Sequence, residues 1–154
     1  MTGPTPLPGG EDTIAAIATA PGRGALAVVR MSGPDAQQIG AAVLAPFHWT
    51  PGRAFLTELH APYGGAAIDR VIAASFPAPR SFTGEDMLEL TTHGGLLVPA
   101  LALEALLAAG AREAAPGEFT RRAVANGKLD LLQAEAAADL VDARSPAMHR
   151  AALR

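Results

Sequence analysis

Apolar and polar positions alternate in five short segments, and each segment predicts a β-strand. The four earlier segments cover residues 12–19, 25–31, 55–60 and 69–76. The fifth is Leu88-Glu89-Leu90-Thr91, where a strand would turn both leucines to one face and Glu89 to the other. Glycine- and proline-rich turns at 21–24 and 62–65 separate these strands.

Helical patterns fill much of the rest of the chain. We expect helices over 34–44, 96–109 and 118–125, the first one capped by Ser32. Asp130 and Gln133 form a capping-box pattern at the start of a longer helix with a narrow apolar stripe. Ser145-Pro146 predicts the start of another helix, and the chain ends inside it.

Together these elements predict an α/β (α+β) domain with a mixed or antiparallel sheet and packed helices. Residues 1–11 are rich in proline and glycine and are expected to form a disordered leader. Residues 12–117 would form the α/β domain. Residues 118–154 would be the start of a helical domain that continues beyond this sequence.

Composition limits the classes of function. The chain has 154 residues, of which 49% are hydrophobic and 5% aromatic, so the core should be aliphatic. A net charge of −3 argues against a broad nucleic-acid surface. The absence of cysteine excludes disulfides and cysteine-ligated metals and fits a cytoplasmic protein. No apolar run approaches the roughly 20 residues of a membrane span.

Two phosphate-binding motifs are matched only superficially. Gly22 to Ala27 fits G-x-G-x-x-A, but the following segment resembles a strand, so we interpret these residues as a hairpin turn. Gly127-Lys128 lacks the first glycine and the hydroxyl residue of a P-loop, so we expect no GTPase activity from this chain. The four histidines have no i, i+4 spacing, and we predict neither a metal site nor catalytic residues.

Glu89 is the first candidate for a binding residue. It stands on a strand that leads to Gly94-Gly95 and a helix, where backbone N–H groups can face a ligand. The alternative is a solvent-facing carboxylate on a half-buried strand. A basic cluster is formed by Arg112, Arg121, Arg122 and Lys128; it is either an anion contact or a solvated helix face.

Several ordered motifs resemble the N-terminal part of the tRNA-modification GTPase family MnmE, also called TrmE. The motifs are Asp12-Thr13-Ile14 with Ala20-Pro21-Gly22-Arg23-Gly24, Val29-Arg30-Met31-Ser32-Gly33, Ser81-Phe82-Thr83-Gly84-Glu85-Asp86, His93-Gly94-Gly95, Ala115-Pro116-Gly117-Glu118-Phe119-Thr120, and Asn126-Gly127-Lys128-Leu129-Asp130-Leu131. The resemblance extends from Asp12 nearly to the end of the chain.

This resemblance implies an α/β module similar to the folate-binding domains of the glycine-cleavage T protein. The module would bind a tetrahydrofolate derivative (5-formyl- or methylene-tetrahydrofolate) and form a homodimer. GTP, magnesium and potassium would bind only in a GTP-binding domain outside this sequence. With a flavoprotein of the MnmG type, the full protein would modify C5 of the wobble uridine of tRNA.

The family's folate contacts fall on Arg30, Glu89 and Lys128. A carboxylate can accept two parallel hydrogen bonds from a pterin, which suits Glu89. Arg30 and Lys128 would supply cations for folate, in roles that the sequence does not assign. Two alternatives are a stand-alone folate-dependent aminomethyltransferase-like enzyme and a module that only dimerises or contacts tRNA.

Overall fold

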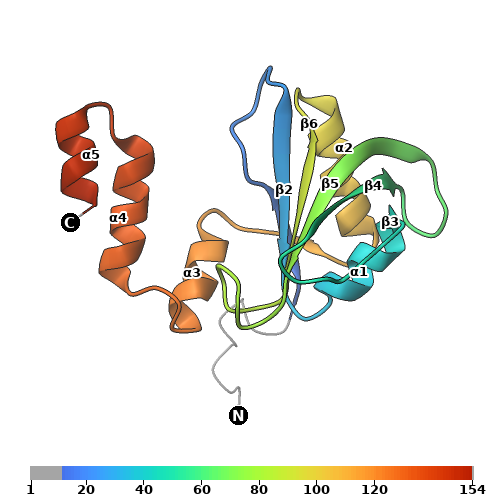
Figure 1. Cartoon of the computed structure of the whole chain (residues 1–154), viewed down its shortest axis with the longest axis horizontal. Coiled ribbons are helices and arrows are strands. Elements are labelled where there is room, and N and C mark those ends of the chain that lie inside the picture. Colours follow the sequence, from blue (N-terminus) through green and yellow to red (C-terminus); the bar gives the residue numbers. More distant parts are fainter. Residues whose placement is uncertain (1–11, 154) are drawn as a thin grey trace, which may run out of the picture.

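The structure, a computed structural model, describes residues 12–153, so the leader predicted at 1–11 lies outside the described residues. A seven-stranded sheet with the order β3-β4-β5-β6-β2-β1-β7 forms the body of the molecule (Figure 1). The strands are β1 (Ile14–Ile17), β2 (Leu26–Ser32), β3 (Leu44–Ala45), β4 (Ala54–His60), β5 (Ala67–Phe76), β6 (Met87–His93) and β7 (Arg112–Glu113).

The sheet is mixed, as the sequence predicts. Strand β1 pairs in parallel with β7, and every other neighbouring pair is antiparallel. The five strands expected from alternation are present, with ends shifted by a few residues. The outer strands β3 and β7 were not expected, because two residues are too few to show a period.

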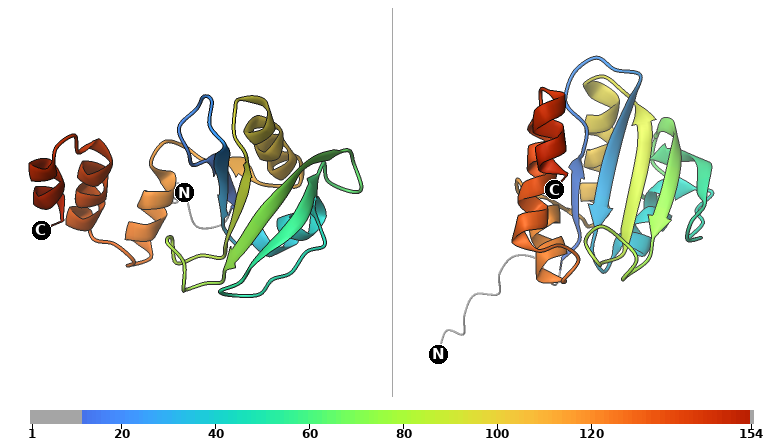
Figure 2. Two further views of the ribbon diagram at one scale, coloured as in Figure 1. Left: turned by 45° about the horizontal axis from the view of Figure 1, so that its top comes forward. Right: turned by 60° about the vertical axis from the view of Figure 1, so that its left-hand side comes forward.

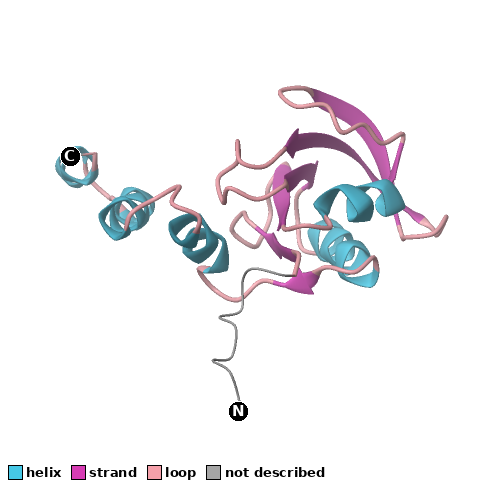
Figure 3. Ribbon diagram, turned by 90° about the horizontal axis from the view of Figure 1, so that it is seen from below, coloured by secondary structure: helices cyan, strands magenta, loops and turns pink. Residues whose placement is uncertain are grey.

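Two helices cover one face of this sheet. They are α1 (Ala36–Val43) and α2 (Leu97–Ala108), which also contact each other (Figure 3). Ile39 of α1 and Leu106 of α2 are buried in one aliphatic core with strand residues such as Val29 and Leu90. Removing these side chains from water is the main stabilising contribution to this part of the fold.

The opposite face of the sheet carries the other half of each alternating pattern. Leu88 and Leu90 are buried on the helix-covered side, whereas Glu89 points to the opposite side and is partly exposed, as predicted. Leu56 of β4 and Ile72 of β5 are exposed on this second face. We call it the open face.

Three further helices extend away from the sheet in a row. They are α3 (Glu118–Ala125), α4 (Leu131–Asp142) and α5 (Pro146–Ala152), and α3 lies nearest to the sheet (Figures 1 and 2). The predicted capping box is present, because Asp130 accepts a hydrogen bond from the Gln133 N–H and Gln133 accepts one from the Asp130 N–H. None of the helices between residues 12 and 153 has the length and apolar character required to cross a lipid bilayer.

One predicted cap is wrong. Ser32 was expected to cap the helix that begins near residue 34, but it is the last residue of β2 and is fully buried. Its hydroxyl instead bonds Thr83 at 2.7 Å and donates to Glu85 at 2.8 Å. The tertiary contact with the loop before β6 therefore replaces the local cap.

Candidate functional site

Arg30 and Glu89 form an ion pair on the open face. They are direct partners in the register of β2 and β6, although 59 positions separate them in the sequence. The Arg30 Nε and Nη2 atoms donate to the same oxygen, Glu89 Oε1, at 3.1 and 3.0 Å. Each side chain keeps 28% of its surface exposed, so the pair is accessible to a ligand.

Two aromatic rings lie within cation–π distance of the Arg30 guanidinium. Its central carbon lies 5.3 Å from the ring centre of Phe82 and 5.7 Å from that of Phe119. Phe82 belongs to the loop between β5 and β6, and Phe119 belongs to the first turn of α3. Such cation–π contacts favour a planar guanidinium over a ring face and orient the pair with Glu89.

A hollow of about 530 Å³ opens beside this arrangement. Arg30, Phe82 and Phe119 line one part of it, and the end of β1 with the segment 113–117 lines the rest. The hollow lies next to the end of the short parallel pairing between β7 and β1, where the chain continues from β7 into residues 114–117. Glu89 is not among the lining residues, so only Arg30 of the pair borders the hollow. A cavity of this size with flat side chains and a cation in its wall can accept a planar heterocycle that bears polar edges.

Lys128 is not part of that lining. It follows the turn after α3, is exposed, and packs its side chain against Gly84. The loop that carries Phe82 therefore lies between α3 and β6, and the side chain of Lys128 packs against this loop. The structure brings Arg30 and Glu89 together and leaves Lys128 on a neighbouring surface.

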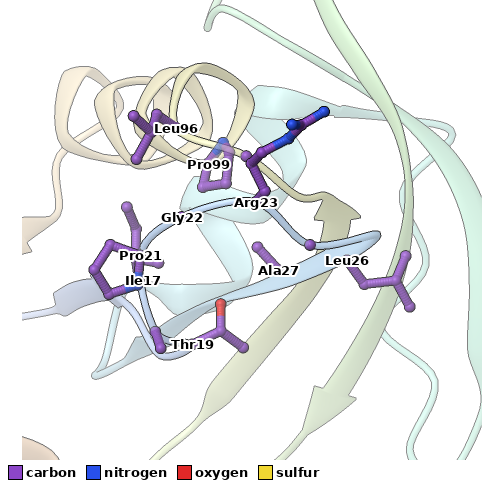
Figure 4. Close-up of a pocket in the computed structure, with 12 residues that line it drawn as sticks. Ile17, Thr19, Pro21, Gly22, Arg23, Leu26, Ala27, Leu96 and Pro99 are labelled. Atoms are coloured by element: carbon purple, nitrogen blue, oxygen red, sulfur yellow. The ribbon is translucent and has the colours of Figure 1, made fainter.

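The predicted link between Glu89 and the glycine pair is wrong. Gly95 and the first residues of α2 border a different, smaller cavity of about 170 Å³ beside the β1–β2 connection (Figure 4). Gly94 is required for another reason, since its N–H donates to Ala25 and an added Cβ would overlap the carbonyl of Gly24. Glu89 stands near the middle of β6, away from this turn.

The prediction of a basic cluster that contacts an anion or faces solvent is also wrong for two of its members, Arg112 and Arg122. Arg122 is buried and Arg112 is partly exposed, and both pair with carboxylates of the same chain instead of leaving a site for an anion. Arg122 is only 2% exposed and pairs with Asp12, Glu85 and Glu118. Arg112 pairs with Asp12 and Glu118, each with a closest approach of 2.6 Å. We call these five residues the ion cluster.

The charges in the ion cluster shift one another's protonation. Hydrogen bonds from Arg112 lower the pKa of Asp12 and of Glu118, more than burial raises them. The same bonds raise the pKa of Arg112 above its ordinary range. The i, i+4 spacing of Glu118 and Arg122 was a local indication of this pairing, but Asp12 and Glu85 could not be assigned from sequence.

His93 has a separate partner. Its ring Nδ1 and its backbone N–H both contact the carboxylate of Asp69, at 2.8 and 2.9 Å. Burial raises the pKa of Asp69, but these hydrogen bonds together lower it below its ordinary value. Among residues 12–153, no group of three or more ligating side chains is arranged to hold a metal ion.

Comparison with known proteins identifies the family to which the chain belongs. Residues 13–128 match the family model of the GTP-binding protein TrmE N-terminus. The chain is 54% identical to a tRNA modification GTPase MnmE of Thiobacillus denitrificans and 53% identical to one of Salinibacter ruber. These alignments cover 97% and 93% of this chain but 33% and 32% of the relatives, so the chain spans about a third of their length. The chain belongs to the TrmE N-terminus family.

Proposed function

We propose that this chain is the folate-binding and dimerisation module of a cytoplasmic tRNA-modifying GTPase. In this proposal Arg30, Glu89 and Lys128 contact a tetrahydrofolate derivative (5-formyl- or methylene-tetrahydrofolate). Residues 12–117 form a folate-binding domain similar to those of the glycine-cleavage T protein, and 118–154 begin a helical domain. GTP hydrolysis, tRNA modification and work with a flavoprotein of the MnmG type belong to the longer protein.

The Arg30–Glu89 pair beside the aromatic hollow is the observation that carries this proposal. Both bonds from Arg30 go to Glu89 Oε1, which leaves Oε2 as the better acceptor for a ligand. A pterin offers an amino group and a ring N–H on one edge, and its flat ring suits a hollow walled by Phe82 and Phe119.

This arrangement favours binding over catalysis. Arg30 holds Glu89 in place as a hydrogen-bond acceptor, and the described residues of the site include no evident general base for transfer of a one-carbon unit. The domain would therefore hold the carrier in position while other parts of the assembly react with it. A tail of glutamate carboxylates would find a cation in exposed Lys128, on the neighbouring surface.

The decisive test is calorimetric titration of 5-formyltetrahydrofolate into wild type and Glu89→Gln. The substitution replaces an acceptor oxygen by a donor, so we expect binding to weaken about 30- to 1,000-fold. The free energy of unfolding should change by less than about 1 kcal/mol, because both partners of the pair are 28% exposed.

Glu58→Gln is the matched control, because Glu58 is an exposed strand carboxylate on β4. It should bind folate like wild type. Equal affinities of wild type and Glu89→Gln would remove Glu89 from the site. Failure of wild type to bind would reject the folate proposal and favour a module that only dimerises or contacts tRNA.

A further inference from the structure

The buried guanidinium of Arg122 joins three segments that are distant in sequence. Its Nη1 atom donates to the Asp12 carbonyl at 2.7 Å and to both oxygens of Glu85 at 3.2 Å. Its Nη2 atom donates to the Asp12 carboxylate at 2.6 Å and to Glu118 at 3.4 Å. Because a buried charge without partners is costly, this geometry strongly restricts where the three segments can lie.

Two of those segments carry the aromatic walls of the hollow. Phe119 directly follows Glu118, and Phe82 lies three positions before Glu85 in the loop that leads to β6. Thr83 stiffens this loop, since its hydroxyl accepts from the Glu85 N–H at 3.1 Å and bonds Ser32 at 2.7 Å. The cation–π contacts of both rings are with Arg30.

We infer that Arg122 is a positioning residue for the ligand hollow, holding Phe82 and Phe119 at cation–π distance from Arg30. The inference rests on the proposed folate function for the identity of the ligand. Arg122 binds Glu85 and Glu118 and is not among the residues that line the hollow, so it would set the separation of the two walls without touching the ligand. Phe82 and Phe119 come from a loop and a helix start, and β2–β6 pairing alone fixes neither.

The test compares Arg122→Met with Arg121→Met, its neighbour on α3, which is exposed and outside the ion cluster. In titrations with 5-formyltetrahydrofolate, Arg122→Met should raise Kd by about tenfold or more, and Arg121→Met by less than about twofold. In the Phe119→Ala background, Arg122→Met should raise Kd by a smaller factor than it does in wild type. The reason is that Arg122 is proposed to act by positioning the Phe119 ring, which this background lacks. Equal Kd values for folded Arg122→Met and wild type would overturn the inference.

Glu85→Gln is the second variant if Arg122→Met does not fold. It keeps an acceptor for Ser32 but removes the charge that pairs with Arg122, so Kd should rise about threefold to tenfold. An unchanged Kd for Glu85→Gln in that case would overturn the inference.

A measurement without ligand separates this inference from the folate proposal. The Arg30 Nε–Hε resonance in NMR spectra should be displaced by the ring currents of Phe82 and Phe119 in wild type and in Arg121→Met. The displacement should shrink in Arg122→Met or, if that variant is unfolded, in Glu85→Gln. If wild type binds no folate, a reduced displacement would still support the positioning role, and an unchanged one would reject it.

Discussion

The backbones of Gly94 and Gly24 lie next to each other, but only one of the two positions excludes a side chain. The backbone of Gly94 passes so close to Gly24 that a side chain on Gly94 would overlap the Gly24 carbonyl. A Cβ on Gly24 would meet only the Leu26 carbonyl, at an ordinary distance of 3.7 Å. Gly94 therefore serves close backbone approach at the top of β6, whereas Gly24 has room for a side chain.

This difference predicts the stability of two alanine variants. Gly94→Ala should lower the free energy of unfolding by about 2 kcal/mol or more, because rigid backbone must move to admit the methyl group. Gly24→Ala should change it by less than about 1 kcal/mol. Urea unfolding of both proteins measures the difference, and equal midpoints would show that the two backbones do not approach this closely.

Among the elements, α3 is held to the sheet by charge as well as by apolar contact. Its buried residues are Glu118, Arg122 and Ala123, and the first two belong to the ion cluster. Arg112 of β7 and Asp12 before β1 complete the connection. Removing one partner from a buried pair leaves the other charge uncompensated, so the position of α3 depends on the ionisation of its carboxylates.

The lowered pKa values of Asp12 and Glu118 predict sensitivity to acid. Their ordinary values are 3.8 and 4.5, and in the folded protein both lie lower. The unfolded chain therefore binds protons first as the pH falls, so this stabilisation is complete above about pH 5.5 and is lost through the folded pKa values. The stability of wild type, followed by urea unfolding between pH 7 and pH 3, should fall over this window.

Glu118→Gln is the control for this prediction. It removes one of the titrating groups, so its stability should change less steeply over the same acidic range, although it starts from a lower value at pH 7. Identical pH slopes for wild type and Glu118→Gln would contradict a role for the ion cluster in acid sensitivity.

At the scale of the whole molecule, two apolar surfaces are exposed in different places. One is the open face of the sheet, with Leu56 and Ile72. The other lies on α3 and α4, where the predicted stripe of Leu131, Ala134, Ala138 and Val141 borders an apolar groove. Exposed apolar surface of this kind favours association.

We expect the chain to self-associate through its α/β part, as proposed for the dimerisation module. Ile72→Lys on the open face should then weaken association in sedimentation equilibrium, since it places a charge in an apolar contact. Val141→Lys on α4 should leave association unchanged. A wild-type monomer at high concentration, or dissociation only by Val141→Lys, would contradict association through the sheet.

Short-range features of this protein could be predicted from the sequence alone. The alternation around Glu89, the capping box at Asp130 and the helix at 118–125 were all predicted and are present. Each depends on residues within a few positions of one another, where backbone geometry and local hydrogen bonds decide the outcome. Glu89 was a candidate from its place on a strand as well as from family resemblance, whereas Arg30 and Lys128 were assigned by resemblance. The role of all three in binding folate stays a prediction.

Only the tertiary structure decided which of these residues meet. Arg30 and Glu89 become neighbours through strand register across 59 positions, and Arg122 reaches Asp12 across 110. The sequence marks Arg112 and Arg122 as cations but not their carboxylate partners, and Ser32 as a cap but not its buried contacts with Thr83 and Glu85. Such contacts depend on how distant segments pack. Burial makes an unpaired charge or hydroxyl costly, so the folded chain must bring a partner to it, and that partner can come from any part of the sequence.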